Sequence, residues 1–165
     1  MLLKAIKLTN FLSYGDHSET IRLERLNVII GANGSGKSNL LEAIEFIKSA
    51  PKDLIAPIRD GGGVRDWLWK GAEIPMPASV EVVIDYPANP PDLRYSLSFT
   101  EVSQGFEILD ERVEGAVPVT GHQAPYLYYK FENGHGVLNI KGKNRKLQRE
   151  DIEPNQSILS QRKDP

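Results

Sequence analysis

Residues 26–39 read LNVIIGANGSGKSN, and this stretch decides how the rest of the sequence is interpreted. From Gly31 to Ser38 it fits the phosphate-binding pattern GxxxxGK(S/T) at every position. The apolar run Leu26–Ile30 before the loop predicts a buried strand, and the residues after the loop predict a helix. Because the pattern requires a strand, a loop and a helix in this order, the sequence predicts a polyphosphate site here.

The residue types of this loop suit the binding of a polyphosphate. Glycines let successive backbone N–H groups approach and face an anion without interference from side chains. Lys37 supplies a positive charge that reaches the β- and γ-phosphates, and the Ser38 hydroxyl is the expected ligand of Mg²⁺. The start of the following helix adds a partial positive charge. The candidate phosphate-binding residues are Asn33, Gly34, Ser35, Gly36, Lys37, Ser38 and Asn39, with Gly31 at the start of the loop.

The segments next to the loop predict strands before it and a helix after it. Residues 2–14 alternate apolar and polar side chains closely enough to predict a strand, and Glu19–Leu23 predict its partner. Residues 37–50 predict an amphipathic helix that stops at Pro51. The apolar positions at helical spacing are Leu40, Leu41, Ile44 and Ile47.

The rest of the chain divides into three parts. We expect irregular or helical structure over residues 51–77, and an antiparallel β region over residues 78–143, where short strand patterns alternate with turn residues. Residues 144–165 are expected to form a basic loop and a short final segment. With residues 1–50, these parts predict an α/β fold in which a nucleotide-binding lobe carries an antiparallel β-meander.

Composition limits the possible functions. The chain has 165 residues, of which 40% are hydrophobic and 25% charged, which is typical of one globular domain. It has no cysteine, which excludes disulfide scaffolds, thiol nucleophiles and cysteine-ligated zinc, so a metal site must use oxygen ligands. No apolar run approaches the ~20 residues that span a bilayer, and no secretory signal is present, so we expect a cytoplasmic protein without a membrane partner.

The charge balance does not indicate a broad nucleic-acid surface. The net charge is −2, but the stretch KGKNRKLQR over residues 141–149 is strongly basic. The positions that could contact DNA phosphates are Lys141, Lys143, Arg145, Lys146 and Arg149. A solvated loop is the simpler interpretation of the same residues.

The loop and its flanks resemble the ATP-binding heads of the SMC/RecF/RecN family of ABC-type ATPases. The resemblance covers residues 2–47, from IKLTNFLSY to LNVIIGANGSGKSNLLEAI, and is weaker beyond them. About 30 residues precede the loop, whereas the loop of small kinases lies closer to the N-terminus. Further along, Trp69-Lys-Gly71 and Gln156-Ser-Ile-Leu-Ser-Gln161 lie where such heads carry a turn into the meander and the Q-loop.

The resemblance implies several functional features. It implies ATP and Mg²⁺ as cofactors, with a Q-loop glutamine, either Gln156 or Gln161, completing the shell of the metal. It also places the adenine near Phe11, Ser13 and Tyr14, although the alternating pattern around Phe11 favours a core position for that residue. Heads of this family dimerise on ATP and act on DNA in repair, chromosome organisation or defence against phage.

Parts of a complete head are absent from the sequence. It contains no signature like LSGGQ and no apolar run that ends in Asp-Glu, so the catalytic glutamate is not identified. We therefore expect the N-terminal part of a head, whose partner is either the C-terminal half of the same head or a second copy. By itself, the chain is expected to hydrolyse ATP very slowly.

Two other functions fit the same loop. The run Val82-Val-Ile-Asp85 has the form of a Walker B strand, and a small P-loop kinase would use Asp85 to hold Mg²⁺. The alternation of that run and the strand patterns after it argue against this assignment. A nucleotide-dependent switch or scaffold without turnover is the second alternative.

Overall fold

In the computed structural model, eight strands form one sheet with the order β2-β1-β3-β4-β5-β6-β7-β8, and all neighbouring pairs are antiparallel. The structure describes residues 2–86, 92–132, 134–140, 143–147 and 153–161. The strands are β1 (Leu3–Thr9), β2 (Ile21–Arg22), β3 (Ala78–Asp85), β4 (Asp92–Val102), β5 (Gly105–Pro118), β6 (Pro125–Glu132), β7 (His135–Ile140) and β8 (Lys143–Leu147).

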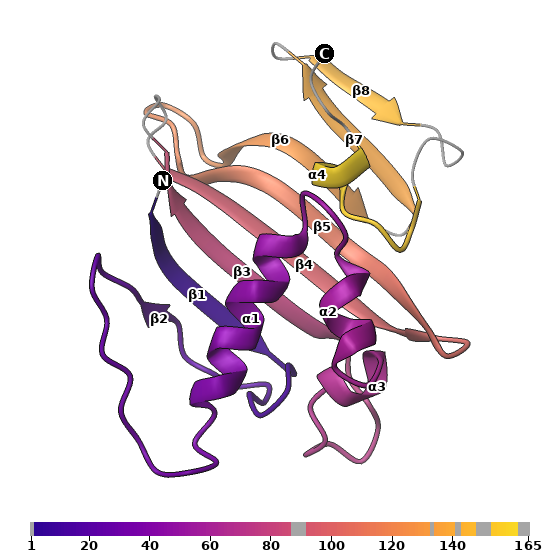
Figure 1. The fold of residues 1–165 in the computed structure, drawn as a ribbon. Coiled ribbons are helices and arrows are strands. Elements are labelled where there is room, and N and C mark those ends of the chain that lie inside the picture. The colour runs from indigo at the N-terminus through magenta and orange to yellow at the C-terminus, as the bar shows by residue number, and fades with distance from the viewer. Residues whose placement is uncertain (1, 87–91, 133, 141–142, 148–152, 162–165) are drawn as a thin grey trace.

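The helices cover one face of this sheet (Figure 1). They are α1 (Lys37–Ser49), α2 (Ile55–Asp60), α3 (Val64–Trp67) and α4 (Ile158–Gln161). Because side chains alternate between the two faces of a strand, alternate residues in part of β3 (Ala78, Val80 and Val82) and of β4 (Tyr95, Leu97 and Phe99) are buried. The result is a two-layer α/β fold with an antiparallel sheet, which confirms the predicted class and the meander.

Aromatic side chains fill the layer between α1 and the sheet. The ring centroids of Phe11 and Trp67 lie 5.5 Å apart, and those of Phe46 and Phe99 lie 5.3 Å apart. Phe11, Phe46 and Phe99 have no exposed surface, and burial of each contributes about 1.5–3 kcal/mol. This cluster joins the end of β1, the middle of α1, and β4, so it fixes the position of α1 on the sheet.

The predicted helix over residues 37–50 is confirmed, but the predicted buried face is partly wrong. Leu40, Ala43 and Phe46 are the buried residues of α1. Leu41 is 59% exposed, while Ile44 and Ile47 are only partly buried. The helix turns Phe46 toward the aromatic cluster, and this rotation moves Leu41 toward the outside.

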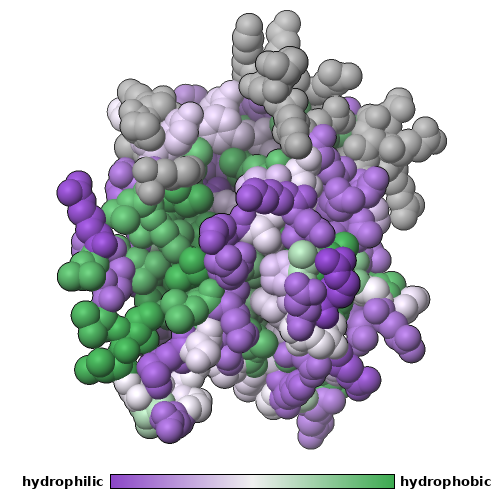
Figure 2. Space-filling view, viewed as in Figure 1, coloured by the Kyte–Doolittle hydropathy of each residue, from purple (hydrophilic) through white to green (hydrophobic). Residues whose placement is uncertain are grey.

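The prediction of a buried strand at Leu26–Ile30 is wrong. Within the described residues, this segment pairs with no strand. Leu26, Val28 and Ile30 are 83%, 81% and 86% exposed. Figure 2 shows a hydrophobic area on this side of the molecule. The β-branched residues favour an extended backbone, but none of the strands that the structure describes pairs with this segment.

The ends of the other helices and strands lie close to the positions expected from the sequence in most places. The partner of the first strand is shorter than predicted, since β2 contains only Ile21 and Arg22. Residues 51–77 contain the short helices α2 and α3. The expected basic loop from residue 144 is wrong in part, because β8 continues the meander over residues 143–147. Of the five basic positions, Lys141 and Arg149 lie outside the described residues, and Lys146 is exposed.

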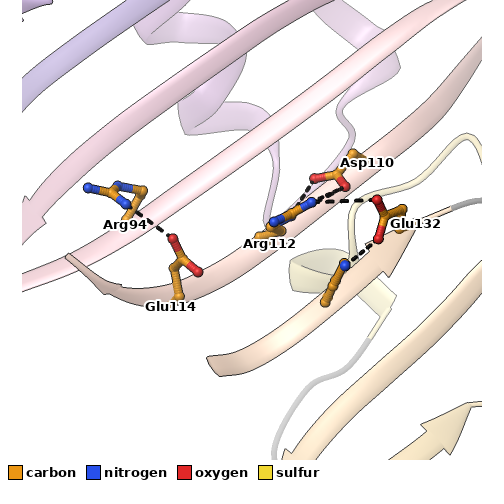
Figure 3. A network of polar contacts seen from close by, with 6 residues as sticks. Arg94, Asp110, Arg112, Glu114 and Glu132 are labelled. Atoms are coloured by element: carbon orange, nitrogen blue, oxygen red, sulfur yellow. Dashed lines mark hydrogen bonds and ion pairs between the residues drawn. The ribbon is translucent and has the colours of Figure 1, made fainter. Parts of the chain in front are cut away.

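The face of the sheet opposite the helices carries cross-strand ion pairs (Figure 3). Arg94 of β4 lies between Glu81 of β3, at 3.5 Å, and Glu114 of β5, at 3.2 Å. Arg112 contacts Asp110 at 2.9 Å and Glu132 of β6 at 3.8 Å. Since positive and negative groups neutralise one another here, this face does not form a basic surface for nucleic acid.

None of the helices in the described ranges is long and apolar enough to cross a membrane.

Candidate functional site

The phosphate-binding loop ends at the start of α1, where backbone N–H groups are free. Gly34 and Gly36 have φ angles of 79° and 87°, which side chains disfavour, so glycine is required at both positions. Gly36 precedes the helix, no side chain caps it, and the first turn contains no acidic residue. The first helical bond runs from the Leu40 N–H to the Gly36 carbonyl, so the preceding N–H groups have no acceptor within the helix. An anion is the group that this helix start suits best.

The Lys37 side chain folds back over the loop. Its ammonium group donates hydrogen bonds to the carbonyl oxygens of Gly31, at 2.9 Å, and Ala32, at 2.6 Å. It also lies 3.4 Å from the Ser35 hydroxyl. These acceptors are weak compared with a phosphate, since hydrogen bonds between charged groups are stronger than those to neutral ones. The loop therefore holds a lysine that can exchange carbonyl partners for phosphate oxygens.

A tight turn after β1 supports the last glycine of the loop. Phe11 and Tyr14 form an isolated bridge, which folds the chain back on itself. The Tyr14 hydroxyl donates a hydrogen bond of 3.1 Å to the Gly36 carbonyl. A Cβ atom at Gly36 would lie 2.8 Å from the Ser13 hydroxyl oxygen. Ser13 and Tyr14 are thus brought to the loop, whereas Phe11 lies in the core and offers no surface to a base.

Two hollows flank the loop. One, of about 350 Å³, is lined by Tyr14, Arg22, Asn27 and Lys37 together with apolar residues. The other, of about 440 Å³, lies against Ser13 and Asn39 and is bounded by the loop after α3. Asp66 of α3 lines it together with four residues of that loop, Leu68, Trp69, Lys70 and Gly71. The sequence predicts a turn at Trp69 and Gly71, and the structure adds that both residues line this hollow.

The described residues place no free carboxylate at these hollows. The first hollow has no Asp or Glu in its lining. In the second, Asp66 accepts a hydrogen bond of 2.7 Å from Lys70, which lowers the pKa of that carboxyl. No cluster of three or more potential metal-ligating Asp, Glu or His side chains occurs within the described ranges. The role of the Ser38 hydroxyl as a metal ligand stays a prediction.

Asp85 does not approach the loop. It lies at the end of β3 that pairs with the beginning of β1, where Ile84 is opposite Leu3. The loop contacts the turn that follows the other end of β1, about 20 Å away at 3.3 Å per strand residue. Asp85 instead forms an ion pair of 3.4 Å with Lys4. This position argues against the kinase alternative, which needs Asp85 beside the metal.

The two candidate Q-loop glutamines also lie away from the loop. Figure 1 shows α4 toward the end of the molecule opposite the Lys37 end of α1. Gln161 hydrogen-bonds the backbone of Glu153 and the Gln156 carbonyl, while Gln156 donates to the Glu153 carboxylate at 2.7 Å. The whole Gln161 amide and the amide nitrogen of Gln156 are therefore engaged within the turn over residues 153–161. Their role as metal ligands stays a prediction.

A buried carboxylate that sequence reasoning missed holds this turn. Glu111 of β5 is 2% exposed and accepts hydrogen bonds from Tyr95 and Ser157 and from the N–H of Ile158. Burial raises the pKa of Glu111, while these three hydrogen bonds oppose the rise. The only signal in the sequence is an acidic residue at a position where the strand alternation places the core.

Comparison with known proteins identifies the family that the loop suggested. The model of a family described as "AAA domain, putative AbiEii toxin, Type IV TA system" matches residues 26–165. The match begins at the apolar run before the loop and includes the meander and α4. It therefore covers most of the chain, including the phosphate-binding loop, but not the first strand and turn on which the sequence-based resemblance also depended.

Relatives among characterised proteins are named for chromosome partition, DNA repair or DNA replication. The chain is 30% identical over 99 residues to the chromosome partition protein Smc of Clostridium kluyveri, covering 58% of this chain and 8% of that protein. It is 48% identical over 46 residues to the DNA double-strand break repair Rad50 ATPase of Saccharolobus solfataricus, covering 28% and 5%. For the DNA replication and repair protein RecF of Thermosynechococcus vestitus, the identity is 33% over 97 residues, covering 59% and 23%. The chain thus matches only a small part of each relative.

A solved structure confirms the fold. It is described as "Structural biochemistry of ATP-driven dimerization and DNA stimulated activation of SMC ATPases", and it matches 90% of this chain and 73% of that chain. The TM-score is 0.51 and the sequence identity is 22%. At this identity the similarity shows the fold alone, and that fold is the lobe of an SMC-type ATPase head predicted from the loop.

Proposed function

Because this chain belongs to the AAA-domain family whose model matches residues 26–165 and resembles the SMC/RecF-like ATPases, we propose that it binds ATP with Mg²⁺. The observation that carries the proposal is the uncapped start of α1 behind a loop with two positive-φ glycines. In the proposed complex, the phosphates accept hydrogen bonds from the loop N–H groups and from Lys37, and Ser38 contributes a metal ligand. Asn33 and Ser35 lie within the same loop, and Asn39 directly follows it.

The chain by itself is proposed to bind nucleotide with little turnover. Hydrolysis needs a group that orients and activates water, and no free carboxylate lines the hollows beside the loop within the described residues. In the proposed complete ATPase, another part of the head supplies this group. A switch without turnover has the same binding step, and measured hydrolysis by the full protein distinguishes the two.

The exposed segment Leu26–Ile30 supports a second part of the proposal. Three of its side chains are more than four-fifths exposed, and an extended apolar segment of this kind is a template for strand pairing. We propose that the remaining part of the same head covers this segment. The small share of each relative that the chain matches supports this choice. Dimerisation of two completed heads on ATP belongs to the same proposal.

DNA is the proposed partner of the completed protein, and the proposed location is the cytoplasm. The relatives are named for chromosome partition and for DNA repair. The basic stretch over residues 141–149 is the local feature that suits phosphate contacts. The sheet face opposite the helices does not suit phosphate contacts, because its basic side chains pair with acidic ones. Defence against phage is a further role of such ATPases that fits the same proposal.

Titration with ATP and Mg²⁺ tests the binding site. Lys37→Ala removes the charge that we assign to the phosphates, and loss of a charged hydrogen bond of about 1.5–3 kcal/mol predicts roughly 10- to 150-fold weaker binding. The matched control is Lys48→Ala on the same helix, whose ammonium pairs with Glu45 at 3.0 Å. Equal ATP affinity in the wild type and Lys37→Ala contradicts the proposal.

A further inference from the structure

The turn over residues 10–15 carries backbone strain next to the phosphate-binding loop. Asn10 and Leu12 both have a φ angle of 51°, in the left-handed region that side chains disfavour. Residues persist in this region where the surrounding structure holds them, and they gather at functional sites. The Tyr14 hydroxyl of the same turn donates to the Gly36 carbonyl. Whatever holds the turn therefore also acts on the last glycine of the loop.

The start of the loop after α3 holds this turn by backbone hydrogen bonds. The Leu12 N–H donates to the Trp67 carbonyl at 2.8 Å. Two residues further along, the Trp69 N–H donates to the Asn10 carbonyl at 2.9 Å. An antiparallel bridge lies between the two bonds. Both strained residues are thus paired with the same three-residue segment.

The Trp69 indole adds a side-chain contact to this backbone pairing. A Cβ atom at Gly15 would lie 3.1 Å from the six-membered ring of the indole, which is closer than ordinary van der Waals contact. A Cβ atom at Gly71 would overlap the same ring. Neither glycine has a positive φ, so the ring and not the backbone disfavours a side chain at these positions. The indole therefore packs against both glycines and joins the end of the turn to the loop after α3.

We propose that Trp69 is a positioning residue for the phosphate-binding loop. Its indole fixes the turn, and the turn fixes the loop through Tyr14 and through Ser13, whose hydroxyl oxygen would lie 2.8 Å from a Cβ atom at Gly36. Trp69 lines the hollow beside Ser13 and Asn39, and its role requires no contact with the phosphates. The role rests on the proposed function, in which the loop binds ATP.

The expected effect of losing the indole is moderate, because the turn lies between the ring and the loop. Residues in contact are typically coupled by factors of roughly 2 to 150 in an equilibrium constant. We expect Trp69→Ala to weaken ATP binding about 5-fold, near the lower end of this range. The backbone bond of residue 69 remains in this variant, so the turn stays paired and only the contact of the ring is lost.

Gly15→Ala tests the same contact from the other side. The added methyl group displaces the indole without backbone strain, so ATP binding is again expected to weaken about 5-fold. Trp69→Phe has a smaller ring and is expected to weaken binding about 2-fold. In the double variant the smaller ring leaves room for the methyl group, so it should bind ATP more tightly than Gly15→Ala alone. Two independent defects would add and not compensate.

Titration of the full chain with ATP and Mg²⁺ measures these affinities, at a temperature where thermal melting shows that each variant is folded. The matched control is Ile74→Ala on the same loop, whose side chain is 74% exposed, and we expect it to have wild-type affinity. In the Tyr14→Phe background, Trp69→Ala is expected to weaken binding less than in the wild type. The reason is that the hydrogen bond by which the turn acts on Gly36 is already lost.

The outcomes separate this role from the proposed function. If folded Trp69→Ala binds ATP as tightly as the wild type, Trp69 does not position the loop, while the nucleotide site stands. The same conclusion follows if Trp69→Phe does not rescue Gly15→Ala, or if the effects of Trp69→Ala and Tyr14→Phe add in full. Should Trp69→Ala not fold, the rescue of Gly15→Ala decides. If neither the wild type nor Lys37→Ala binds ATP, the proposed function itself is overturned.

Discussion

The Tyr14 hydroxyl donates a hydrogen bond of 3.1 Å to the carbonyl oxygen of Gly36, across 22 positions of sequence. This bond joins the turn after β1 to the last glycine before α1. It gives the loop a fixed neighbour on one side, while Gly31, Ala32 and Asn33 on the other side are exposed. The orientation of the helix start therefore depends on a residue that was considered only as a partner of adenine.

Tyr14→Phe is expected to weaken ATP binding modestly. The ring remains, but the Gly36 carbonyl loses one of its two donors and keeps the Leu40 N–H, which corresponds to about 0.5–1.5 kcal/mol or roughly 2- to 12-fold in affinity. Isothermal titration measures this change. Tyr128→Phe, on the opposite part of the sheet, is the control, and a Tyr14→Phe chain with wild-type affinity would show that the bond does not orient the loop.

Gly36→Ala is expected to be more harmful than Gly34→Ala. Both positions have positive φ, so each alanine is strained by about 1–2 kcal/mol. At Gly36 the added Cβ also meets the Ser13 oxygen at 2.8 Å, whereas at Gly34 nothing lies within 4 Å. Thermal unfolding and ATP affinity of the two variants measure the difference, and a larger loss in Gly34→Ala contradicts it.

The double variant Val28→Lys and Ile30→Lys is expected to reduce self-association of the chain without lowering its stability. Both side chains are more than four-fifths exposed, and exposed substitutions usually change stability by less than about 0.5 kcal/mol. Sedimentation and urea unfolding measure the two effects. Val117→Lys with Val119→Lys, at two other exposed valines, serves as the control, and strong destabilisation by the first pair would indicate that the segment is paired after all.

Arg112→Gln is expected to lower stability by at most about 1 kcal/mol, because its ion pairs with Asp110 and Glu132 are partly exposed. Salt screens such pairs, so the difference from the wild type should shrink between low and high ionic strength. Urea unfolding at two salt concentrations checks this. A difference that grows with salt would mean that Arg112 acts through packing and not through its charge.

Glu111 predicts a specific pH dependence of folding. Its pKa is raised in the folded state, mainly by burial, so its contribution is complete below the unfolded value of about 4.3 and is lost as pH rises through the folded pKa. Glu111→Gln cannot ionise, so its stability relative to the wild type should increase from pH 4 to pH 7. Urea midpoints across this interval measure the trend, and a constant difference would show that Glu111 is not desolvated.

The sequence predicts best where local pattern and spacing carry the information. The glycines and Lys37 identify the loop, the period of α1 predicts a helix, and the turn residues predict the meander. The segment Leu26–Ile30 shows the limit, because its β-branched residues indicate an extended backbone but not a partner. The buried face of α1 depends on where Phe46 meets Phe99, which periodicity alone does not specify.

The candidate site was predictable only where its residues are close together in the sequence. The phosphate-binding residues are contiguous, so their spacing is sufficient. The Glu111 carboxylate accepts a hydrogen bond from Ser157, 46 positions away, and no local pattern predicts such a contact. The positions of Gln156 and Gln161 depend on that distant bond. The sequence alone therefore cannot show that both amides contact their own turn, although one of them is expected to bind the metal.

The pairing of β1 with β3 has a consequence for the order in which this molecule assembles. Thr9 faces Ser79, so the 69 residues between them form one long loop that contains the phosphate-binding segment and three helices. Strands β3 to β8 follow one another through short connections and pair with their neighbours in sequence. Contacts that are local in sequence form quickly, whereas closing a long loop is entropically slow. The meander is therefore expected to fold first, and the phosphate-binding loop gains its shape last, when β1 docks along β3.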